Sequence, residues 1–455
     1  MDNPFLGKKI LILGFEKKEY VIASILLSYN ARLIISDGRD LTKDVKAMEL
    51  KKRGATIAEG CYPFYLAEQT YDYIVKHPKV NYQHPLLQRL LKQKQTIISE
   101  LELAHLINKS YLIGVTGSLG KTTTSRLLRE MLIQEGKPAK SAGTDINVLS
   151  NVVHSATNRD IVITPLLSND LIQTKEFRPN LAILLNVHES NSSDYPTPHS
   201  YYMSYARAVT NQEKTDVCIY NFDNEHIRDI ARKSKGRLIP FSMVEPNAFA
   251  YFDGETFFVK QQPIAQEKDI ILRGDYNVEN ILAALAAAAV LGVSLDSMKY
   301  TLSTFNGVEH RLQYLTTIDY RYVYNDSKST TKKAVNNAVH SFAEPVVLIL
   351  NGTEKHLDFA SLLPCFKKVK AVIAYGPEAE RLHQLATLVG NLQSSISDSL
   401  ETAVVKAFDY AVRGDVVLFS PGSKAKNEQK SIEIRGYEFV DVVQQLSKET
   451  PTKLN

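Results

Sequence analysis

The sequence predicts an α/β protein of three domains, spanning residues 1–108, 109–309 and 310–455. Three observations support this prediction. The chain has 455 residues, which is too long for a single hydrophobic core. Short apolar runs alternate with amphipathic stretches, as in parallel sheets flanked by helices. A glycine-rich segment also lies between a predicted strand and a predicted helix.

The composition is that of an ordinary globular protein and excludes several functions. Hydrophobic residues make up 44% and charged residues 23%, so the whole chain is expected to fold. The net charge is +4 without a dense Lys/Arg block, so we expect neither nucleic acid nor a membrane as a partner, and we expect a monomer. The cysteines Cys61, Cys218 and Cys365 are far apart and form no CxxC, so they support neither a disulfide framework nor a zinc site and are expected to be buried or incidental thiols.

Residues 1–108 are expected to form a small parallel sheet, with strands at Ile10–Leu13, Arg32–Ser36 and Tyr73–Val75 and a helix at Glu19–Tyr29. The first apolar run is shorter than a signal-peptide core, so we expect a cytoplasmic protein. Asp37 ends the second strand, where doubly wound folds bind a ribose or a base. A lone aspartate at this position is more often a turn residue, so both interpretations stay open and the turn is the commoner one.

The second domain is expected to have strands at Tyr111–Val115, Asp160–Thr164, Leu181–Leu185 and Val217–Tyr220. Residues 235–272 suggest a small antiparallel excursion with a turn at Phe252–Glu255. The apolar run Ile281–Leu295 is shorter than the ~20 residues needed to span a bilayer, so it predicts a buried helix that follows Asn280.

The glycine-rich segment has the context of a phosphate-binding loop. It departs from the strict GxxxxGK[ST] pattern because Val115 stands at the first glycine. Its backbone N–H groups would converge on phosphate oxygens, Lys121 would reach the outer phosphates, and the Thr122 hydroxyl would bind Mg²⁺. The alternative is a glycine-rich turn with an incidental lysine. The residues expected to bind nucleotide are Gly117, Ser118, Leu119, Gly120, Lys121, Thr122, Thr123 and Thr124.

The third domain repeats the alternation of strands and helices. Strands are predicted at Tyr322–Tyr324, Val346–Leu350, Ala371–Tyr375 and Val416–Phe419, each followed by a polar or glycine-rich turn. Because ligands bind at the carboxyl ends of strands in open parallel sheets, these turns are candidate ligand-binding segments.

Six collinear segments resemble those of the Mur ligases, and most closely the members that add D-glutamate. They are Gly114–Thr124, Lys175–Pro179, Gly274–Asn280, Gly307–Gln313, Asn325–Thr330 and Arg435–Gly436. The resemblance implies a Rossmann-like N-terminal domain for a UDP substrate, a central P-loop ATPase domain with a mixed sheet, and a Rossmann-like C-terminal domain for an amino acid. It implies ATP and Mg²⁺ as cofactors, and UDP-N-acetylmuramoyl-L-alanine and D-glutamate as substrates.

The resemblance also implies residue roles. Lys121, Arg311 and Lys328 correspond to catalytic positions, with Arg311 and Asp326 near ATP. Asn277 and Asn280 correspond to adenine-binding residues at the start of the Ala-rich helix. At the substrate positions, Thr330 and Lys355 would hold the D-glutamate carboxylates, and Asp37 would lie at the uracil.

Several positions depart from the family pattern. A metal-binding glutamate is replaced by Pro165, a histidine by Asn191, and a metal-bridging lysine by Tyr205. Departures at the substrate sites are the loop Glu16–Tyr20, which would crowd a diphosphate, and Thr144, Tyr276, Ala425 and Ile432. Three alternatives therefore stay open: a working D-glutamate ligase, a paralogue that binds nucleotide without turnover, and a ligase for another acid and amino acid.

Overall fold

The computed structural model forms two compact units, one of residues Met1–Ala265 with Glu279–Thr301 and one of Gln266–Val278 with Leu302–Asn455. Each unit is considered by itself. The residues that the structure describes are 3–77, 79–81, 83–143, 147–188, 195, 197–272, 274–352, 360–390, 392–423 and 430–449.

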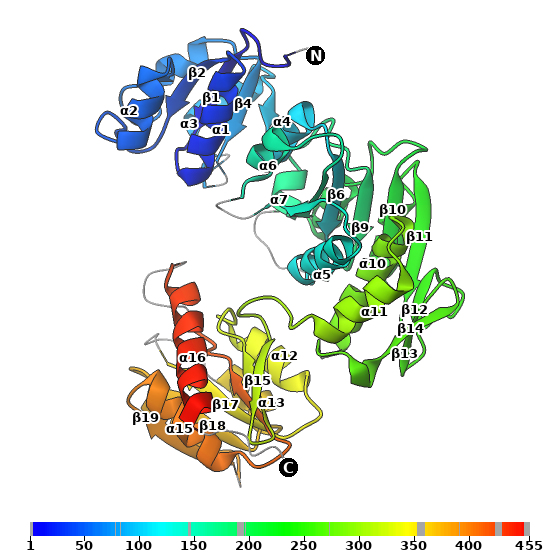
Figure 1. The fold of residues 1–455 in the computed structure, drawn as a ribbon. Coiled ribbons are helices and arrows are strands. Elements are labelled where there is room, and N and C mark those ends of the chain that lie inside the picture. Colours follow the sequence, from blue (N-terminus) through cyan, green and yellow to red (C-terminus); the bar gives the residue numbers. More distant parts are fainter. Residues whose placement is uncertain are drawn as a thin grey trace. The chain divides into compact units, whose positions relative to one another are not determined.

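The first unit opens with a five-stranded parallel sheet in the order β3-β2-β1-β4-β5 (Figure 1). Its strands are β1 (Lys9–Leu13), β2 (Arg32–Ser36), β3 (Thr56–Ile57), β4 (Tyr73–Lys76) and β5 (Ile97–Ile98). Its helices are α1 (Lys17–Ser28), α2 (Val45–Lys52), η1 (Phe64–Glu68), α3 (Pro85–Lys92) and α4 (Glu100–Ile107). The predicted parallel sheet and its three strands are confirmed.

The central sheet has nine strands in the order β14-β13-β12-β11-β10-β9-β6-β8-β7. They are β6 (Tyr111–Thr116), β7 (Ala139–Ser141), β8 (Ile161–Leu166), β9 (Leu181–Leu184), β10 (Val217–Asn221), β11 (Arg237–Ser242), β12 (Ala250–Phe252), β13 (Thr256–Val259) and β14 (Gln262–Gln266). The helices are α5 (Lys121–Gln134), α6 (Leu149–Ser155), α7 (Ser168–Leu171), α8 (Pro198–Ala206), α9 (Glu225–Ala231), η2 (Glu267–Asp269), α10 (Asp275–Val290) and α11 (Leu295–Thr304).

Two predictions for this region were only partly right. Strand β11 pairs in parallel with β10 and so extends the main sheet, and the antiparallel pairing that we expected is found between β12 and β13. The Ala-rich helix starts at Asp275 rather than after Asn280, because the polar first turns that carry both asparagines are helical as well. It ends at Val290, before Gly292 with its positive φ.

The second unit holds a six-stranded sheet in the order β15-β16-β20-β17-β18-β19. All neighbouring strands are parallel except the antiparallel pair β15–β16. The strands are β15 (Gln313–Ile318), β16 (Arg321–Asn325), β17 (Val346–Asn351), β18 (Ala371–Tyr375), β19 (Gln393–Ser397) and β20 (Val416–Phe419). The helices are α12 (Lys332–His340), η3 (Ala360–Leu362), α13 (Leu363–Phe366), α14 (Ala379–Thr387), α15 (Leu400–Tyr410) and α16 (Lys430–Glu449). The four predicted strands are confirmed.

The sheet of the second unit is covered on both faces. Leu348 of β17 packs in one buried cluster with residues of α12 to α14, and its neighbour Ile349 packs in another with α15 and α16. Successive side chains of a strand point to opposite faces, so a continuous apolar run such as β17 marks a strand that is buried on both sides.

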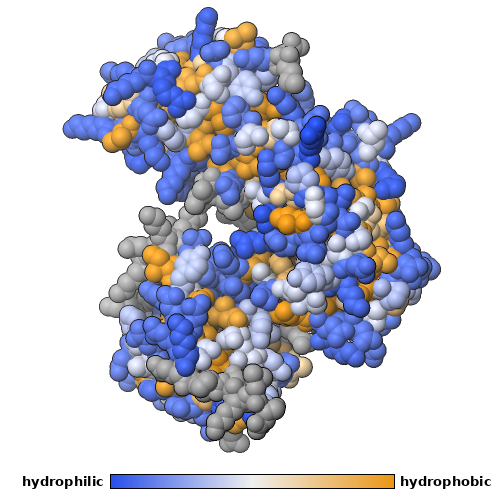
Figure 2. Space-filling model, viewed as in Figure 1, coloured by the Kyte–Doolittle hydropathy of each residue, from blue (hydrophilic) through white to orange (hydrophobic). Residues whose placement is uncertain are grey.

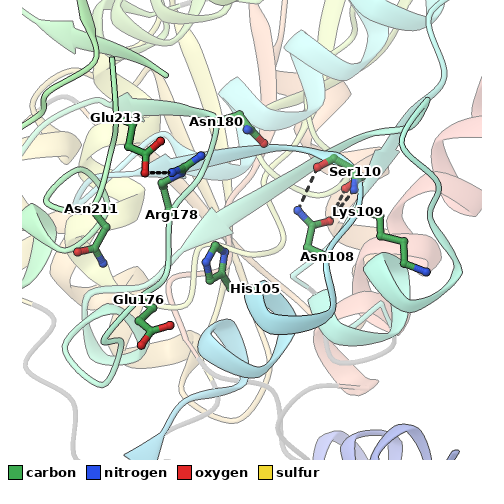
Figure 3. A pocket seen from close by; sticks show the side chains of 9 residues that line it. All are labelled: His105, Asn108, Lys109, Ser110, Glu176, Arg178, Asn180, Asn211 and Glu213. Carbon is green, nitrogen blue, oxygen red and sulfur yellow. Dashed lines mark hydrogen bonds and ion pairs between the residues drawn. The ribbon is translucent and has the colours of Figure 1, made fainter. Parts of the chain in front are cut away.

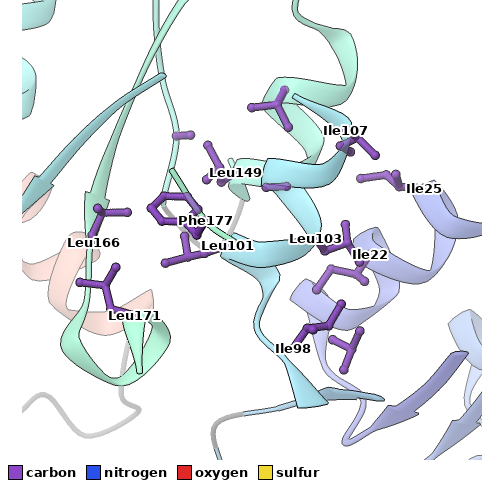
Figure 4. Close-up of a cluster of buried hydrophobic side chains, with 14 of the residues drawn as sticks. Ile22, Ile25, Ile98, Leu101, Leu103, Ile107, Leu149, Leu166, Leu171 and Phe177 are labelled. Atoms are coloured by element: carbon purple, nitrogen blue, oxygen red, sulfur yellow. The ribbon is translucent and has the colours of Figure 1, made fainter. Parts of the chain in front are cut away.

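A shared core joins the two sheets of the first unit. Figure 4 shows Ile22 and Ile25 of α1 near Leu103 and Ile107 of α4, with Phe177 on the other side of α4. The N-terminal and central sheets therefore share one hydrophobic core, to which α4 contributes side chains on two sides.

The surface gives no sign of a membrane-spanning segment. No helix among the described residues is both long and apolar enough to cross a bilayer. The face in Figure 2 is largely hydrophilic, with apolar residues interspersed among polar ones.

Candidate functional site

The glycine-rich segment forms a tight loop between β6 and α5. Gly117 has φ of 148° and Gly120 has φ of 88°, backbone conformations that side chains rarely adopt. The loop delivers the chain to the first turn of α5 at Lys121. The first N–H groups of an α-helix have no partner within the helix, so such a helix end favours an anion.

Lys121 folds back over the loop. Its Nζ donates to the carbonyl oxygens of Gly117 at 2.6 Å and Ser118 at 3.2 Å. Thr122 and Thr123 lie half-buried in the first turn of α5. This places the ammonium beside the loop and two hydroxyl-bearing residues at the helix end.

Asn186 forms two hydrogen bonds with the loop. It was not predicted from the sequence as a site residue. Its Oδ1 accepts from the Leu119 amide at 2.9 Å, and its carbonyl oxygen accepts from the Ser118 amide at 2.8 Å. It follows β9, the neighbour of β6, so its place at a strand's carboxyl end was a signal that could have found it.

Asn280 of α10 reaches the same loop. Its Oδ1 accepts from the Thr124 hydroxyl at 3.3 Å, and both side chains are buried. The neighbouring Glu279 accepts from Asn186 Nδ2 at 3.2 Å, and burial raises the pKa of its carboxyl group. The loop is thus tied into a polar network.

The metal that the resemblance implies is Mg²⁺, and the residues fit it in part. The half-exposed Thr122 carries a hydroxyl oxygen, a suitable ligand for a hard cation beside phosphate. Pro165 of β8 pairs with Val115 of β6, and its side chain has no atom that could bind a metal ion. Tyr205 is buried, and no cluster of three or more His, Cys, Asp or Glu side chains occurs among the described residues. They fit one ion at Thr122 and not a second.

Asp37, at the end of β2, is engaged within the N-terminal sheet. Its carboxylate accepts from the Phe15 amide at 2.6 Å and pairs with Arg39, whose Nε lies at 3.0 Å. Burial raises the pKa of Asp37, but the bonds from Arg39 and Phe15 outweigh burial and the net pKa is lowered. The aspartate therefore stays ionised and fixes the turn after β2.

The amino end of α1 is occupied by the chain's own carboxylates. Glu19 is buried and accepts from the Glu16 amide at 3.1 Å in a capping box. Glu16 pairs with Lys79 at 2.7 Å, and His77 Nε2 lies 3.9 Å from Glu19. Two acidic side chains at the helix end that could attract an anion disfavour a diphosphate there.

In the second unit, Asp326 is buried at the carboxyl end of β16. It accepts from the Ser420 hydroxyl at 2.7 Å and from the Leu312 amide at 3.1 Å. Burial raises its pKa to about 6. The carboxyl group ties the turns after β16 and β20 to the segment that leads into β15.

Among the other predicted residues of this unit, Lys328 and Thr330 closely follow Asp326 in the chain. Arg311 is exposed and acts electrostatically on Asp326, while Lys328 and Thr330 are half-buried in the turn after β16. Asn277 is buried in the first turn of α10. Lys355 and the departures at Thr144, Asn191 and Ala425 lie outside the described residues, as do the side chains of Tyr276 and Ile432.

The residue types of the Arg435–Gly436 segment are explained by packing and hydrogen bonds within the second unit. A Cβ on Gly436 would lie 2.3 Å from His310 Nδ1. Asn325 Nδ2 donates to the Gly436 carbonyl at 3.0 Å, and Arg435 Nη2 donates to the Ser327 carbonyl at 2.9 Å. These contacts bring α16 against the turn that holds Asp326.

A separate polar cavity of about 470 Å³ lies at the other end of the central sheet (Figure 3). It is lined by residues that precede β6, β9 and β10, including Ser110, Arg178 and Glu213. Arg178 pairs with Glu213 at 2.6 Å. The cavity is at the amino ends of these strands, so it is distinct from the glycine loop.

Two family models match the chain. One, described as the Mur ligase middle domain, matches residues 115–288, and the other, described as the Mur ligase, glutamate ligase domain, matches residues 310–422. A UDP-N-acetylmuramoylalanine–D-glutamate ligase of Bacillus mycoides is 36% identical over 443 residues, covering 97% of this chain and 98% of that protein. A relative of the same name from Bacillus thuringiensis is 35% identical over the same shares.

Solved structures share the fold. A UDP-N-acetylmuramate–alanine ligase of Thermotoga maritima has a TM-score of 0.59 and 16% identity, covering 96% of this chain and 100% of that one. A UDP-N-acetylmuramoyl-L-alanyl-D-glutamate–2,6-diaminopimelate ligase has a TM-score of 0.58 and 16% identity, covering 98% and 94%. The predicted α/β fold of three domains is confirmed.

Proposed function

The chain belongs to the Mur ligase family, and we propose that it joins D-glutamate to UDP-N-acetylmuramoyl-L-alanine in peptidoglycan synthesis, with conversion of ATP to ADP and phosphate. The observation that carries the proposal is the 36% identity to a ligase of this name over 97% of the chain. The phosphate loop with Lys121 folded over it supports the use of ATP.

The proposed reaction has two steps. A carboxylate oxygen of the L-alanyl group attacks the γ-phosphorus of ATP, and ADP leaves, which gives an acyl phosphate. The amine of D-glutamate then attacks the acyl carbon, an amide bond forms, and phosphate leaves while the amine loses its protons to solvent. Such chemistry depends on neutralising phosphoryl charge and on positioning the reactants.

The loop residues are proposed to bind the ATP phosphates. Because the Ser118 and Leu119 amides already donate to Asn186, the backbone N–H groups at Gly120 and the amino end of α5 are proposed to meet the phosphates, and Lys121 swings from its carbonyl partners to the outer phosphates. Thr122 is proposed to hold one Mg²⁺, which would offset phosphate charge when bound. Asn280, already against the loop, is proposed to bind the adenine together with Asn277.

The remaining roles and the boundaries at 108/109 and 309/310 are proposals as well. Arg311, Asp326 and Lys328 are assigned to the nucleotide, Thr330 and Lys355 to the amino-acid carboxylates, and Asp37 to the uracil. Asp37 is ionised and rigidly held, which suits recognition of a base edge. Because the reaction consumes ATP, we place it in the cytoplasm, and we propose that the protein acts as a monomer.

The alternative of a nucleotide-binding paralogue without turnover receives no support from the relatives, which carry the ligase name over nearly their full length. That the described residues offer no ligands for a second ion bears on how charge is neutralised rather than on the overall reaction. For a different acid or amino acid, the observation in favour is the pair of carboxylates, Glu16 and Glu19, at the amino end of α1, and against it stands the D-glutamate ligase name of the relatives.

The proposal is tested by phosphate release with ATP, UDP-N-acetylmuramoyl-L-alanine and D-glutamate. Release that requires both substrates supports it. Lys121→Met should lower the rate about 100-fold or more, because one preorganised charge partner is lost. Lys233→Met, at an exposed lysine of the same unit, is the matched control. Folded protein that releases no phosphate above the ATP-only rate would contradict the proposal.

A further inference from the structure

Three hydroxyl groups form a chain that ends at the phosphate loop. Ser118 Oγ lies 3.1 Å from the Tyr201 hydroxyl, which lies 2.7 Å from the Tyr205 hydroxyl. Tyr201 and Tyr205 are one helical turn apart on α8, so both rings project from the same face of the helix. Their rings make an edge contact at 5.3 Å.

Both tyrosines are buried. Tyr201 is 8% exposed and Tyr205 is 3% exposed. Burial raises the pKa of Tyr205, the bond to Tyr201 raises it further, and bonds from the Ser118 and Ser168 hydroxyls lower it by less. The Tyr205 phenol therefore keeps its proton at neutral pH and acts as a hydrogen-bond donor rather than as a metal ligand.

Ser118 is constrained from two more directions. Its Oγ accepts from the His188 amide at 3.1 Å, and its own amide donates to the Asn186 carbonyl at 2.8 Å. A hydroxyl oxygen accepts two hydrogen bonds and donates one. When His188 and Tyr201 both donate to this oxygen, its single hydrogen can turn from Tyr205 to a ligand in the loop.

We propose that Tyr201 and Tyr205 are positioning residues that direct the Ser118 hydroxyl toward a phosphate oxygen of the bound nucleotide. The chain of donors, Tyr205 to Tyr201 to Ser118, is neutral and points toward the anion. Bonds in such a chain polarise one another, so the last donor is strengthened by those behind it. This proposal rests on the nucleotide binding of the proposed function.

The arrangement also accounts for a departure in the sequence. Tyr205 stands where the family resemblance expects a lysine that bridges a second ion. In place of a charged ligand, this chain has a buried phenol that is already committed to Tyr201. Hydrogen-bond donation from the loop serine thus supplies part of the phosphate stabilisation that the described residues do not provide through a second ion.

The test is direct binding of the ATP analogue AMP-PNP with Mg²⁺, measured by calorimetry, so that it does not depend on turnover. Ser118→Ala should weaken binding about 10-fold, the range for a lost hydrogen bond to a charged group. Tyr201→Phe keeps the ring and removes the donor, and should weaken binding about 3- to 10-fold, with a smaller effect for Tyr205→Phe. Tyr202→Phe is the control, because Tyr202 stacks on His226 instead.

A double-mutant cycle separates positioning from packing. If Tyr201 acts through Ser118, Tyr201→Phe should change affinity less than about 2-fold in the Ser118→Ala background. An equal loss in both backgrounds would overturn the proposal, as would a Tyr201→Phe affinity equal to wild type. A wild-type chain that binds no nucleotide would overturn both this proposal and the proposed function, whereas nucleotide binding that is insensitive to Tyr201 would overturn this one alone.

Discussion

Asn280 occupies the space next to Gly120: a Cβ added to that glycine would lie 2.0 Å from Asn280 Oδ1. The loop can therefore lie this close to α10 only because Gly120 has no side chain. Because Gly120 also has φ of 88°, two independent constraints fix glycine at this position.

Gly120→Ala should lower affinity for Mg²⁺ and AMP-PNP at least 10-fold, because Asn280 or the loop must move. Gly136→Ala is the matched control, since Gly136 also has positive φ but nothing lies within 4 Å of its added Cβ. Gly136→Ala should lose about 1 kcal/mol of stability from backbone strain alone, Gly120→Ala should lose more because the overlap with Asn280 adds to the strain, and only Gly120→Ala should lose affinity. Equal affinities of the Gly120→Ala and Gly136→Ala variants for AMP-PNP in calorimetry would contradict the steric argument.

Glu102 is predicted to be a major stabilising residue of the first unit. Its buried carboxylate accepts from the amides of Lys175, Glu176 and Phe177 at 2.9, 2.7 and 3.0 Å. Glu102→Ala leaves three donors unsatisfied and should cost about 3 kcal/mol or more in urea unfolding. Glu59→Ala, at an exposed glutamate, should cost less than about 0.5 kcal/mol. A Glu102→Ala midpoint equal to wild type would refute this role.

Asp326 predicts a pH dependence of stability. Burial raises its folded pKa from 3.8 to about 6, so between these values the folded state holds a proton that the unfolded state has lost. Stability from this group is present below about pH 4 and is lost as pH rises to about 6, by about 3 kcal/mol. Relative to wild type, Asp326→Asn should therefore become more stable between pH 4.5 and pH 7. Parallel pH profiles in urea unfolding would contradict this assignment.

The metal prediction follows from the described residues. With AMP-PNP bound, the chain should bind about one Mn²⁺ tightly, counted by electron paramagnetic resonance, because Thr122 offers a ligand and Pro165 and Tyr205 do not. Chelation of divalent ions should abolish turnover, since phosphoryl charge then lacks its cation. Two tight Mn²⁺ ions per chain would show that residues outside the described part complete a second site.

The buried strands were the most predictable elements. Ala371–Tyr375 and Val416–Phe419 matched the structure residue for residue, because strands buried on both faces form continuous apolar runs bounded by polar turns. The edge strands β15 and β19 were missed because polar residues such as Gln313 and Ser395 interrupt their apolar pattern. Helix α16 was missed for a similar reason, as its apolar residues are spread among charged ones.

The site was predictable where backbone geometry dictates residue type. Glycine spacing and the following lysine predicted the tight loop between β6 and α5, since residues other than glycine rarely adopt its positive φ. The residues that hold the loop could not be read in the same way. Asn186 bonds an amide 67 positions away, and Tyr205 was recognised only as a departure, because its bond to Tyr201 depends on the three-dimensional path of α8.

The most direct measurement follows oxygen from substrate to phosphate. UDP-N-acetylmuramoyl-L-alanine labelled with ¹⁸O in its carboxylate is incubated with ATP and D-glutamate, and the products are analysed by mass spectrometry. The proposed acyl phosphate predicts that each new amide is accompanied by inorganic phosphate carrying one ¹⁸O atom. Amide product with unlabelled phosphate, or folded protein that forms no amide at all, would contradict the proposed function.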